Sequence, residues 1–400
     1  MNTTSLVSQS NITLERDISN NARAVTAKIH RFLTGQPPDT PFLVVDLDII
    51  AEKYLTLSRL LPQAQVYYAI KANPAPEILK ILVELGSSFD TASVFEIEQC
   101  IAAGADPDRI SYGSTIKKAG DIAYAYKLGV RLFAFDSLCE LEKIATNAPG
   151  ARVYCRLLMK NDGAEWPLSK KFGCEIDMAY DLLLHSLSLG IEPYGVSFHV
   201  GSQQTDPSQW DNAISKTAML FSALKCAGVQ LSMVNLGGGF PARYRSEILS
   251  VDTYADAIMK AMSRYFGSCI PVMMIEPGRS LVGDAGVIQS EVVLISHKSY
   301  ADDKRWVFLD IGLYNGLSET INECIKYRIR TPKDGGPTGP VFLAGPTCDS
   351  ADILYEKAGY ELPINLRVGD RIEILSAGAY TNACSSVGFN GFPPLKVYYI

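Results

Sequence analysis

The sequence predicts an α/β fold in which a (β/α)8 barrel (TIM barrel) is followed by a C-terminal β-rich domain. Eight short apolar runs recur over roughly 240 residues, and segments with helical periodicity separate them. Beyond residue 280 the pattern changes to apolar runs between turns rich in glycine and proline. We assign residues 36–280 to the barrel and 281–400 to the β domain. Residues 1–35 form an N-terminal segment that we expect to be partly disordered or to pack on the β domain.

The predicted barrel strands are 66–71, 87–93, 110–113, 132–137, 152–158, 194–200, 233–239 and 272–279. They are apolar throughout, as expected when helices shelter both faces of a parallel sheet. A doubly wound open sheet is the alternative, and it is favoured only if two of the eight runs are not strands.

The segments between these strands have apolar residues three and four apart, with a glycine just past the end. Examples are 75–86, 93–104 and 179–190, and this pattern is typical of crossover helices. In the β domain we expect strands at 291–298, 305–311, 340–347, 370–380 and 395–400. Short helices are predicted at 318–327 and 350–359, and an exposed loop at 330–340.

Composition limits the classes of function. The chain has 400 residues, of which 47% are hydrophobic and 20% charged, and its net charge is -6. Without a basic run, this charge argues against nucleic acid or an anionic membrane surface and favours a small-molecule partner. Nine scattered cysteines without CxxC spacing indicate a reduced, cytoplasmic compartment and no metal site. No apolar stretch approaches the roughly 20 residues that a membrane-spanning helix requires.

Polar residues end several of the predicted strands. Lys71 ends the first, and in barrels of this kind catalytic groups lie at the carboxyl ends of the strands. A single lysine at a strand end can simply mark where the chain meets water, so the inference depends on its neighbours. The polar residues at the other strand ends are Asp90, Arg156, His199, Glu276 and Arg279. We therefore expect a functional site at this mouth of the barrel.

Three consecutive glycines, residues 237–239, follow the seventh strand. Their bare backbone N–H groups can approach an anion closely, and the loops after strands seven and eight are the usual phosphate site of this architecture. The glycines alone could equally form a tight turn, but Arg279 on the next strand end favours phosphate. A lysine, a phosphate cradle, a carboxylate and an imidazole in one mouth suggest pyridoxal 5'-phosphate bound as a Schiff base.

Six stretches resemble the motifs of barrel-type (fold III) pyridoxal-phosphate decarboxylases, the ornithine, lysine and diaminopimelate decarboxylase family. In order they are "YYAIKANP", "SFHVGSQ", "LGGGFP", "EPGRSLVGDAG", "GPTCDSAD" and "GAYTNACSSVGFNGF". The resemblance runs from about residue 41 to residue 400, and six motifs in the same order are specific. It implies an amino acid decarboxylase that works through an aldimine on a lysine and a quinonoid intermediate.

The resemblance assigns roles to individual residues. Lys71 resembles the aldimine lysine, His199 the imidazole stacked on the cofactor ring, and Glu276 the carboxylate that pairs with the pyridine nitrogen. That pairing keeps the ring protonated and therefore able to accept electrons. The residues matching positions near the phosphate are Ser202, Gly238, Gly239, Arg279 and Tyr380, and those behind the cofactor are Asp90 and Arg156.

The resemblance also implies a homodimer with shared active sites. In the family, the residues corresponding to Cys348 and Asp349 enter the site of the neighbouring subunit. Cys348 would then return a proton to Cα and Asp349 would hold the distal amine of the substrate, while Lys71 remains an alternative proton donor. Phe389, in the last motif, is a further expected substrate contact.

The substrate is less defined by the sequence. Asn322 and Glu323 align with a Tyr-Asp pair of animal ornithine decarboxylases, so Glu323 could neutralise a substrate ammonium group or simply face solvent on a helix. We favour decarboxylation of ornithine or lysine to a diamine, as in polyamine biosynthesis. Diaminopimelate and arginine decarboxylase are alternatives, and an amino acid racemase or a non-catalytic homologue that binds a partner protein is less favoured.

Overall fold

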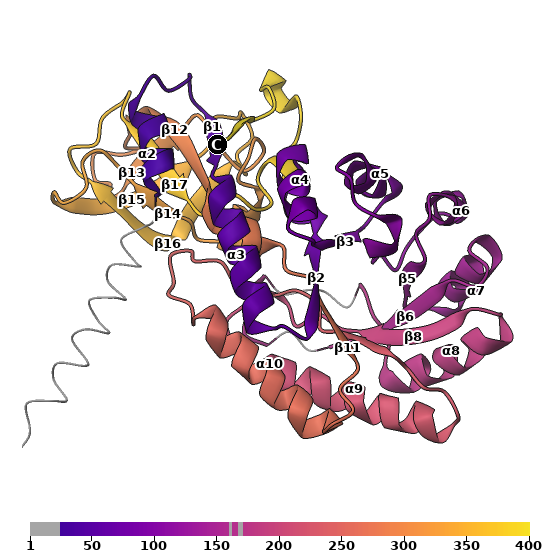
Figure 1. Cartoon of the computed structure of the whole chain (residues 1–400). Coiled ribbons are helices and arrows are strands. Elements are labelled where there is room, and N and C mark those ends of the chain that lie inside the picture. Colours follow the sequence, from indigo (N-terminus) through magenta and orange to yellow (C-terminus); the bar gives the residue numbers. More distant parts are fainter. Residues whose placement is uncertain (1–24, 160–161, 167–170) are drawn as a thin grey trace, which may run out of the picture.

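The computed structural model describes residues 25–159, 162–166 and 171–400, so most of the predicted N-terminal segment lies outside the described residues. Figure 1 shows a barrel surrounded by helices at one end of the molecule and a domain of β-strands at the other. Among the described residues, no helix is long and apolar enough to cross a membrane.

Eight parallel strands close the barrel, and each corresponds to one of the eight predicted runs. This confirms the predicted (β/α)8 architecture and excludes the open-sheet alternative. In order around the barrel the strands are β2 (Ala64–Ala69), β3 (Ser88–Thr91), β4 (Ile110–Tyr112), β5 (Leu132–Phe135), β6 (Arg152–Arg156), β8 (Glu192–Ser197), β10 (Met233–Asn235) and β11 (Val272–Ile275).

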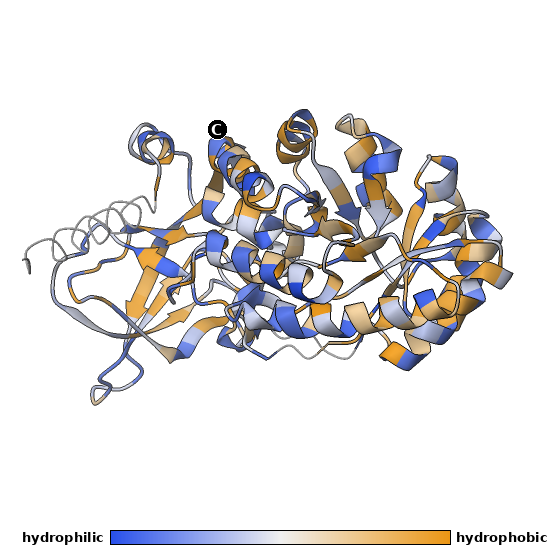
Figure 2. Ribbon diagram, turned by 60° about the horizontal axis from the view of Figure 1, so that its bottom comes forward, coloured by the Kyte–Doolittle hydropathy of each residue, from blue (hydrophilic) through white to orange (hydrophobic). Residues whose placement is uncertain are grey.

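Helices follow the barrel strands and turn an apolar side toward them. In α4, which begins at a proline, Ile78, Leu79 and Leu82 are fully buried at the spacing of one helix face. Figure 2 shows that the helices carry both hydrophilic and hydrophobic residues, whereas the strands are mostly hydrophobic. The barrel helices are α3 (Leu47–Leu60), α4 (Pro76–Glu84), α5 (Val94–Ala102), α6 (Ala119–Lys127), α7 (Leu138–Asn147), α8 (Ile176–Ser188), α9 (Ser208–Cys226) and α10 (Val251–Phe266).

The second domain is built on an eight-stranded sheet. The order β14-β17-β12-β13-β15-β16 forms its main path, and β1 joins it by pairing with β12 and β18. The strands are β1 (Phe42–Val45), β12 (Gly286–Ser296), β13 (Arg305–Leu309), β14 (Arg328–Arg330), β15 (Thr338–Ala344), β16 (Ile353–Pro363), β17 (Arg371–Leu375) and β18 (Lys396–Tyr399). Two short strands form a separate antiparallel pair. They are β7 (Ala164–Trp166), which follows β6 in the chain, and β9 (Ser202–Gln204), which follows β8.

Strand β1 corrects the boundary that we drew at residue 36. It lies within the stretch assigned to the barrel, yet it belongs to the second domain, because Phe42 and Val44 pack with Val287 of β12. Helix α2 (Ala27–Thr34) packs on the same cluster through Ile29 and Leu33. The chain therefore starts its described course in the β domain, enters the barrel at α3 and returns after β11.

The predicted helix at 350–359 is wrong. These residues lead into strand β16, which pairs antiparallel with β15 and buries Tyr355 and Tyr360. The partner strand β15 directly precedes β16 in the chain, so the two form a local antiparallel pair, which the apolar spacing within 350–359 does not reveal by itself. The predicted helix at 318–327 is only a 3-10 turn, η4 (Ser318–Glu323), which is interrupted where Asn322 adopts a φ of 54°.

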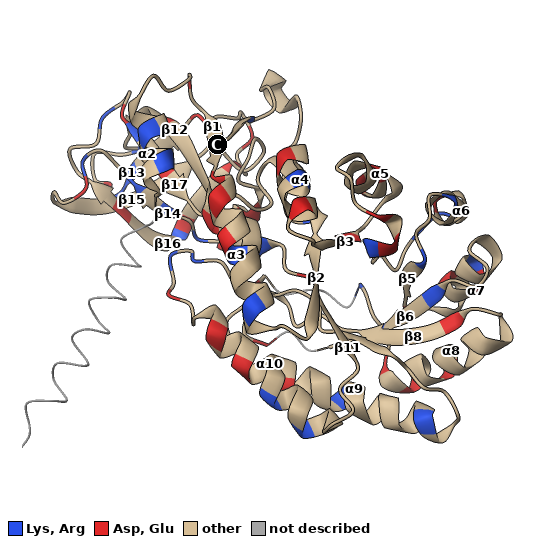
Figure 3. Cartoon of the chain, viewed as in Figure 1, with Lys and Arg blue, Asp and Glu red and all other residues tan. Residues whose placement is uncertain are grey.

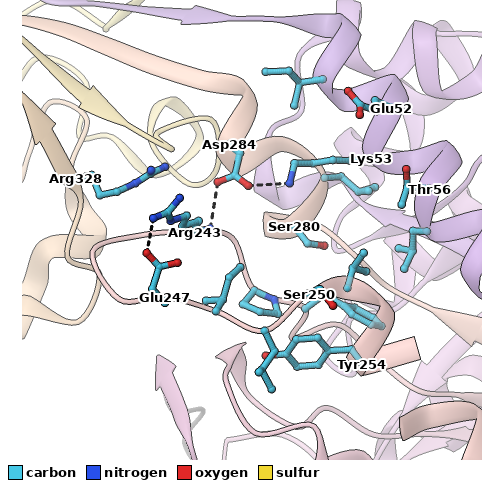
Figure 4. A pocket seen from close by; sticks show the side chains of 18 of the residues that line it. Glu52, Lys53, Thr56, Arg243, Glu247, Ser250, Tyr254, Ser280, Asp284 and Arg328 are labelled. Carbon is cyan, nitrogen blue, oxygen red and sulfur yellow. Dashed lines mark hydrogen bonds and ion pairs between the residues drawn. The ribbon is translucent and has the colours of Figure 1, made fainter. Parts of the chain in front are cut away.

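Asp284 connects the two domains. Its carboxylate lies 2.7 Å from Lys53 Nζ of α3 and accepts a hydrogen bond of 2.9 Å from Ser376 Oγ, which follows β17. It also accepts one from the backbone N–H of Arg243 (Figure 4). Asp284, Lys53 and Arg243 border a cavity of about 600 Å³ between α3, α10 and the β domain, and none of the predicted site residues lines it.

We expect Asp284→Asn to destabilise the protein at neutral pH. Burial opposes the charge, but Lys53 and the hydrogen bonds lower the pKa of Asp284 below its ordinary value. The stabilisation by the ionised Asp284 is therefore complete above a pH of about 3.9, the pKa of an aspartate in the unfolded chain. It is lost as the pH falls through the lower pKa that Asp284 has in the folded protein. Because Lys53 is 34% exposed, we expect the free energy of unfolding to fall by about 2 kcal/mol rather than by the 3–5 kcal/mol of a fully buried pair.

Urea unfolding of the wild-type and Asp284→Asn proteins at pH 7 and at pH 3 measures this difference. The exposed Asp303→Asn serves as the control, and an effect of Asp284→Asn that does not shrink in acid would contradict the role of its charge.

Candidate active site

The predicted site residues that follow the barrel strands gather at one mouth of the barrel. Because all eight strands are parallel, their carboxyl ends meet at the same rim. Lys71 lies in a short turn, η1 (Ile70–Ala72), directly after β2, and Asp90 is the penultimate residue of the neighbouring β3. His199 follows β8, and Glu276 follows β11. The sequence thus places four chemically different groups around one opening.

Lys71 forms an ion pair with Asp90, and 3.7 Å separates its Nζ from Oδ2. Burial would lower the pKa of Lys71, but the charges of Asp90, Tyr380 and Glu276 outweigh it and raise the pKa above its ordinary value. For Asp90, burial and the nearby Glu276 raise the pKa well above the ordinary carboxyl value. Lys71 is therefore held in its protonated form beside Asp90, and it must pass that proton to a neighbouring base before it can act as a nucleophile.

Gly113 makes room for Asp90, and our sequence reasoning missed this role. A Cβ at position 113 would lie 1.9 Å from Asp90 Oδ1, an atom that is buried without a hydrogen-bond partner among the described residues. A buried polar atom without a partner is costly unless a ligand or water satisfies it. The glycine at the end of the predicted strand 110–113 was the available signal.

His199 is held as a neutral imidazole. Burial, followed by the charges of Arg156 and Lys71, lowers its pKa well below the ordinary value. Nδ1 accepts a 3.0 Å hydrogen bond from the backbone N–H of Gly201, so the ring proton belongs on Nε2. An uncharged, oriented ring is suited to packing against a flat aromatic ligand. Arg156 itself lies 5.2 Å from the centre of the Phe172 ring and supplies positive charge to this region.

Asn235 links Glu276 to the glycine loop and is a second residue that sequence reasoning missed. Its side-chain amide donates to the carboxylate of Glu276, while its carbonyl oxygen accepts from the N–H of Gly237 at 2.9 Å. The backbone N–H of Glu276 in turn donates to the carbonyl of Gly237 at 2.9 Å. These contacts fix the direction of the carboxylate relative to the loop. Position 235 ends the strand β10, but an asparagine there has no distinctive spacing.

The loop 237–239 requires glycine at every position. A Cβ on Gly237 would lie 2.2 Å from the carbonyl oxygen of Phe198, and one on Gly238 would lie 2.6 Å from that of Glu276. Gly239 has a φ of 104°, which other residues rarely adopt. The loop is therefore packed between the ends of β8 and β11, and it carries no side chains of its own. Its role as a phosphate cradle stays a prediction.

The β domain contributes Tyr380 to the same mouth. Its backbone N–H donates to the carbonyl of Ala72, next to Lys71, at 2.8 Å, and its ring centre lies 4.8 Å from the guanidinium carbon of Arg279. Burial raises the pKa of Tyr380, so its hydroxyl remains a donor at neutral pH. Arg279 contacts Ser202 Oγ at 3.2 Å. The two predicted phosphate residues after β11 and β17 are thus brought together with Ser202.

The arrangement fits pyridoxal phosphate. The amine of Lys71 can bind the aldehyde, the carboxylate of Glu276 can face the pyridine nitrogen, and the imidazole of His199 can cover the ring. The glycine loop, with Ser202 and Tyr380, offers donors for the phosphate. Asp90 Oδ1, which is buried without a hydrogen-bond partner among the described residues, can accept a hydrogen bond from a polar group of the ligand.

Cys348, Asp349 and Phe389 form a separate group on the β domain. The N–H of Cys348 donates to Asn390 at 2.7 Å, and Asp349 accepts a 3.0 Å hydrogen bond from the hydroxyl of Tyr314. The Tyr314 ring centre lies 4.6 Å from that of Phe389. Within the described ranges, no hydrogen bond or ion pair joins this group directly to Lys71, and Cys348 and Phe389 are exposed.

The carboxylate of Glu323 binds backbone groups of the β domain. Its Oε1 accepts hydrogen bonds from the backbone N–H groups of Glu356 at 2.7 Å and Lys357 at 2.6 Å, so it anchors strand β16 to η4. The backbone at this point is a turn with a positive φ at both Asn322 and Glu323, so the alternative of a solvent-facing residue on a helix is wrong. The structure gives Glu323 a contact with the backbone of β16, and its role with substrate stays a prediction.

Comparison with known proteins defines the family. The model of the pyridoxal-binding domain of pyridoxal-dependent decarboxylases matches residues 47–283. The lysine/ornithine decarboxylase of Selenomonas ruminantium is 35% identical over 355 residues, which cover 88% of this chain and 88% of that protein. Antizyme inhibitor 2 of Xenopus laevis is 34% identical over 372 residues, which cover 90% of this chain and 80% of that protein. The crystal structure of an arginine decarboxylase from Paramecium bursaria Chlorella virus is 30% identical, has a TM-score of 0.85 and is matched over 94% and 100% of the two chains. The chain therefore belongs to the pyridoxal-phosphate-dependent decarboxylase family of the ornithine and lysine type.

Proposed function

We propose that this protein decarboxylates a basic L-amino acid, ornithine or lysine, to the corresponding diamine. The observation that carries the proposal is the pairing of Lys71 with Asp90 at a mouth that also holds Glu276 and a neutral His199. The similarity to a lysine/ornithine decarboxylase supports the choice of substrate class. Diaminopimelate is less suitable, because its second carboxylate requires a cation where the motif places Asp349.

Bound pyridoxal phosphate supplies an electron sink for the bond to the departing carboxylate. Lys71 Nζ gives up its proton toward Asp90 Oδ2 before it acts as a nucleophile, and it recovers one when the product leaves. Glu276, oriented by Asn235, would hold a proton on the ring nitrogen of the bound cofactor, and His199, oriented by the N–H of Gly201, would cover the ring and keep water from it. Lys71 is also one candidate for returning the proton to Cα.

Cys348 and Asp349 complete the site from a second copy of the chain in this proposal. Both lie on the surface of the β domain with Phe389, away from direct contact with Lys71. In a homodimer, Cys348 of the partner subunit would protonate Cα, and Asp349 of the partner subunit would bind the distal ammonium group of the substrate.

Mixing two inactive variants tests this shared site. Lys71→Ala removes one half of the site and Cys348→Ala the other, and loss of an acid costs about 10²–10⁴-fold in rate. Random reassembly makes half of the dimers mixed, and each mixed dimer has one intact site of two, so about a quarter of the wild-type activity should return. Mixing Lys71→Ala with Lys71→Arg should restore none. If sedimentation shows dimers but the first mixture stays inactive, the sites are not shared.

Carbon dioxide release and amine formation from ornithine, lysine, arginine and meso-diaminopimelate test the substrate. We expect ornithine or lysine to give the highest kcat/KM. The arginine decarboxylase among the structural neighbours makes arginine the first competitor. The similarity to an antizyme inhibitor favours a second candidate, a non-catalytic regulator. A protein that binds cofactor but releases no carbon dioxide from any of the four substrates would favour the regulator.

A further inference from the structure

Arg279, which the resemblance assigns to the cofactor phosphate, already uses all of its donors within the chain. Its Nε and Nη2 contact Ser202 Oγ at 3.3 and 3.2 Å, and Nη1 donates to the hydroxyl of Tyr244 at 2.7 Å. The remaining donors bind both carboxylate oxygens of Glu319, with 2.6 Å from Nη1 to Oε2. A guanidinium group has five N–H donors, and these contacts account for every one.

The partner of Arg279 is a buried carboxylate. Glu319 is 6% exposed and Arg279 is 4% exposed. Glu319 lies in the turn η4 of the β domain, whereas Arg279 begins the short helix α11 (Arg279–Val282) after β11. A two-pronged contact of this kind is the strongest geometry that arginine and a carboxylate can form. Glu319 therefore fixes the guanidinium group at the edge of the cradle.

This pair changes the charge of the phosphate site. A cofactor phosphate carries between one and two negative charges at neutral pH, and Glu319 places another negative charge on the same guanidinium group. Like charges that share one buried cation weaken each other's binding. The glycine loop, Ser202 and Tyr380 supply uncharged donors, which the pair does not neutralise.

We propose that Glu319 is a positioning residue which holds Arg279 in place and, through it, limits how tightly the site retains the cofactor phosphate. The phosphate is then held mainly by the backbone N–H groups of the glycine loop and by the hydroxyls of Ser202 and Tyr380, while Arg279 orients Ser202. The inference rests on the proposed function only in that the cofactor binds at Lys71. The pairing of Arg279 with Glu319 makes the cofactor easier to exchange than it would be in a cradle with an unpaired arginine.

The test compares pyridoxal phosphate with pyridoxal, which lacks the phosphate but can still bind Lys71. Glu319→Gln removes the negative charge and keeps an oxygen that can accept from Arg279. We expect the Kd for pyridoxal phosphate, measured by absorbance on cofactor-stripped protein, to fall about tenfold, and the Kd for pyridoxal to change less than twofold. Glu373→Gln, which alters another Arg–Glu pair of the β domain, should change neither value. Weaker binding of pyridoxal phosphate, or an equal change for both ligands, would overturn the proposal.

A double-variant cycle keeps the proposal testable if Glu319→Gln folds poorly. Arg279→Gln alone leaves Glu319 as an uncompensated negative charge beside the phosphate, so it should weaken pyridoxal phosphate binding by at least about 30-fold. Replacing both residues by glutamine removes the pair together and should recover most of that loss. No recovery would contradict the proposal. If neither ligand gives an absorbance band that borohydride bleaches in the wild-type protein, the proposed function fails instead.

Discussion

Lys71→Ala should abolish the yellow colour of the protein and lower decarboxylation by at least about 10³-fold, the scale on which loss of a covalent or acid-base group acts. The amine that pairs with Asp90 is then missing, so the aldehyde of the cofactor has no nucleophile at the mouth of the barrel. Cofactor could still bind through the glycine loop, but it would lack the covalent bond that orients it. The loss should therefore appear in kcat as well as in cofactor affinity.

Two further variants separate the covalent role of Lys71 from its charge. Lys71→Arg keeps a positive charge beside Asp90 but cannot form the Schiff base, and we expect it to be as inactive as the alanine variant. Lys80→Ala, which changes an exposed lysine of α4, should behave as wild type. Peptide mapping after borohydride reduction should find the label on position 71. A label on another lysine, or an active Lys71→Arg protein, would remove the basis of the proposed mechanism.

The sequence predicted the barrel well because its signals are local and repeated. All eight barrel strands are short apolar runs, and the helices α4 to α10 follow the first seven of them, so the predicted runs match the strands in order. The mouth of the barrel followed from the same logic, since Lys71, Asp90, His199 and Glu276 each come at or just after a strand end. A parallel barrel converts this position in the sequence into proximity in space.

The errors arose where pairing between strands, rather than the spacing of apolar residues, decides the structure. Strand β1 belongs to the second domain because it pairs with β12 and β18, which lie more than 200 residues away. The segment 350–359 has apolar residues spaced as in a helix, but it leads into strand β16, which pairs with the strand β15 just before it. The partnership of Arg279 with Glu319 also joins two domains, and no local pattern marks the glutamate as part of the cradle.

Gly238→Ala should weaken binding of pyridoxal phosphate by roughly 30- to 150-fold, corresponding to about 2–3 kcal/mol. The new Cβ would lie 2.6 Å from the carbonyl oxygen of Glu276 and 3.4 Å from Nε2 of His199. Backbone cannot yield as a flexible side chain would, so the loop must move away from the end of β11. That movement displaces the N–H groups of the cradle and turns the Glu276 carboxylate away from the ring nitrogen.

The position of Gly238 makes this a test of space rather than of backbone conformation. Gly237 and Gly239 have positive φ angles, so alanine there would also strain the backbone, whereas Gly238 is not among the residues with a positive φ. Gly120→Ala, in α6 where a Cβ meets nothing within 4 Å, is the matched control and should leave cofactor affinity unchanged. Titration of cofactor-stripped proteins measures both affinities. If Gly238→Ala binds the cofactor as tightly as wild type, the loop can move without cost, and the close contact with β11 does not hold the cradle in place.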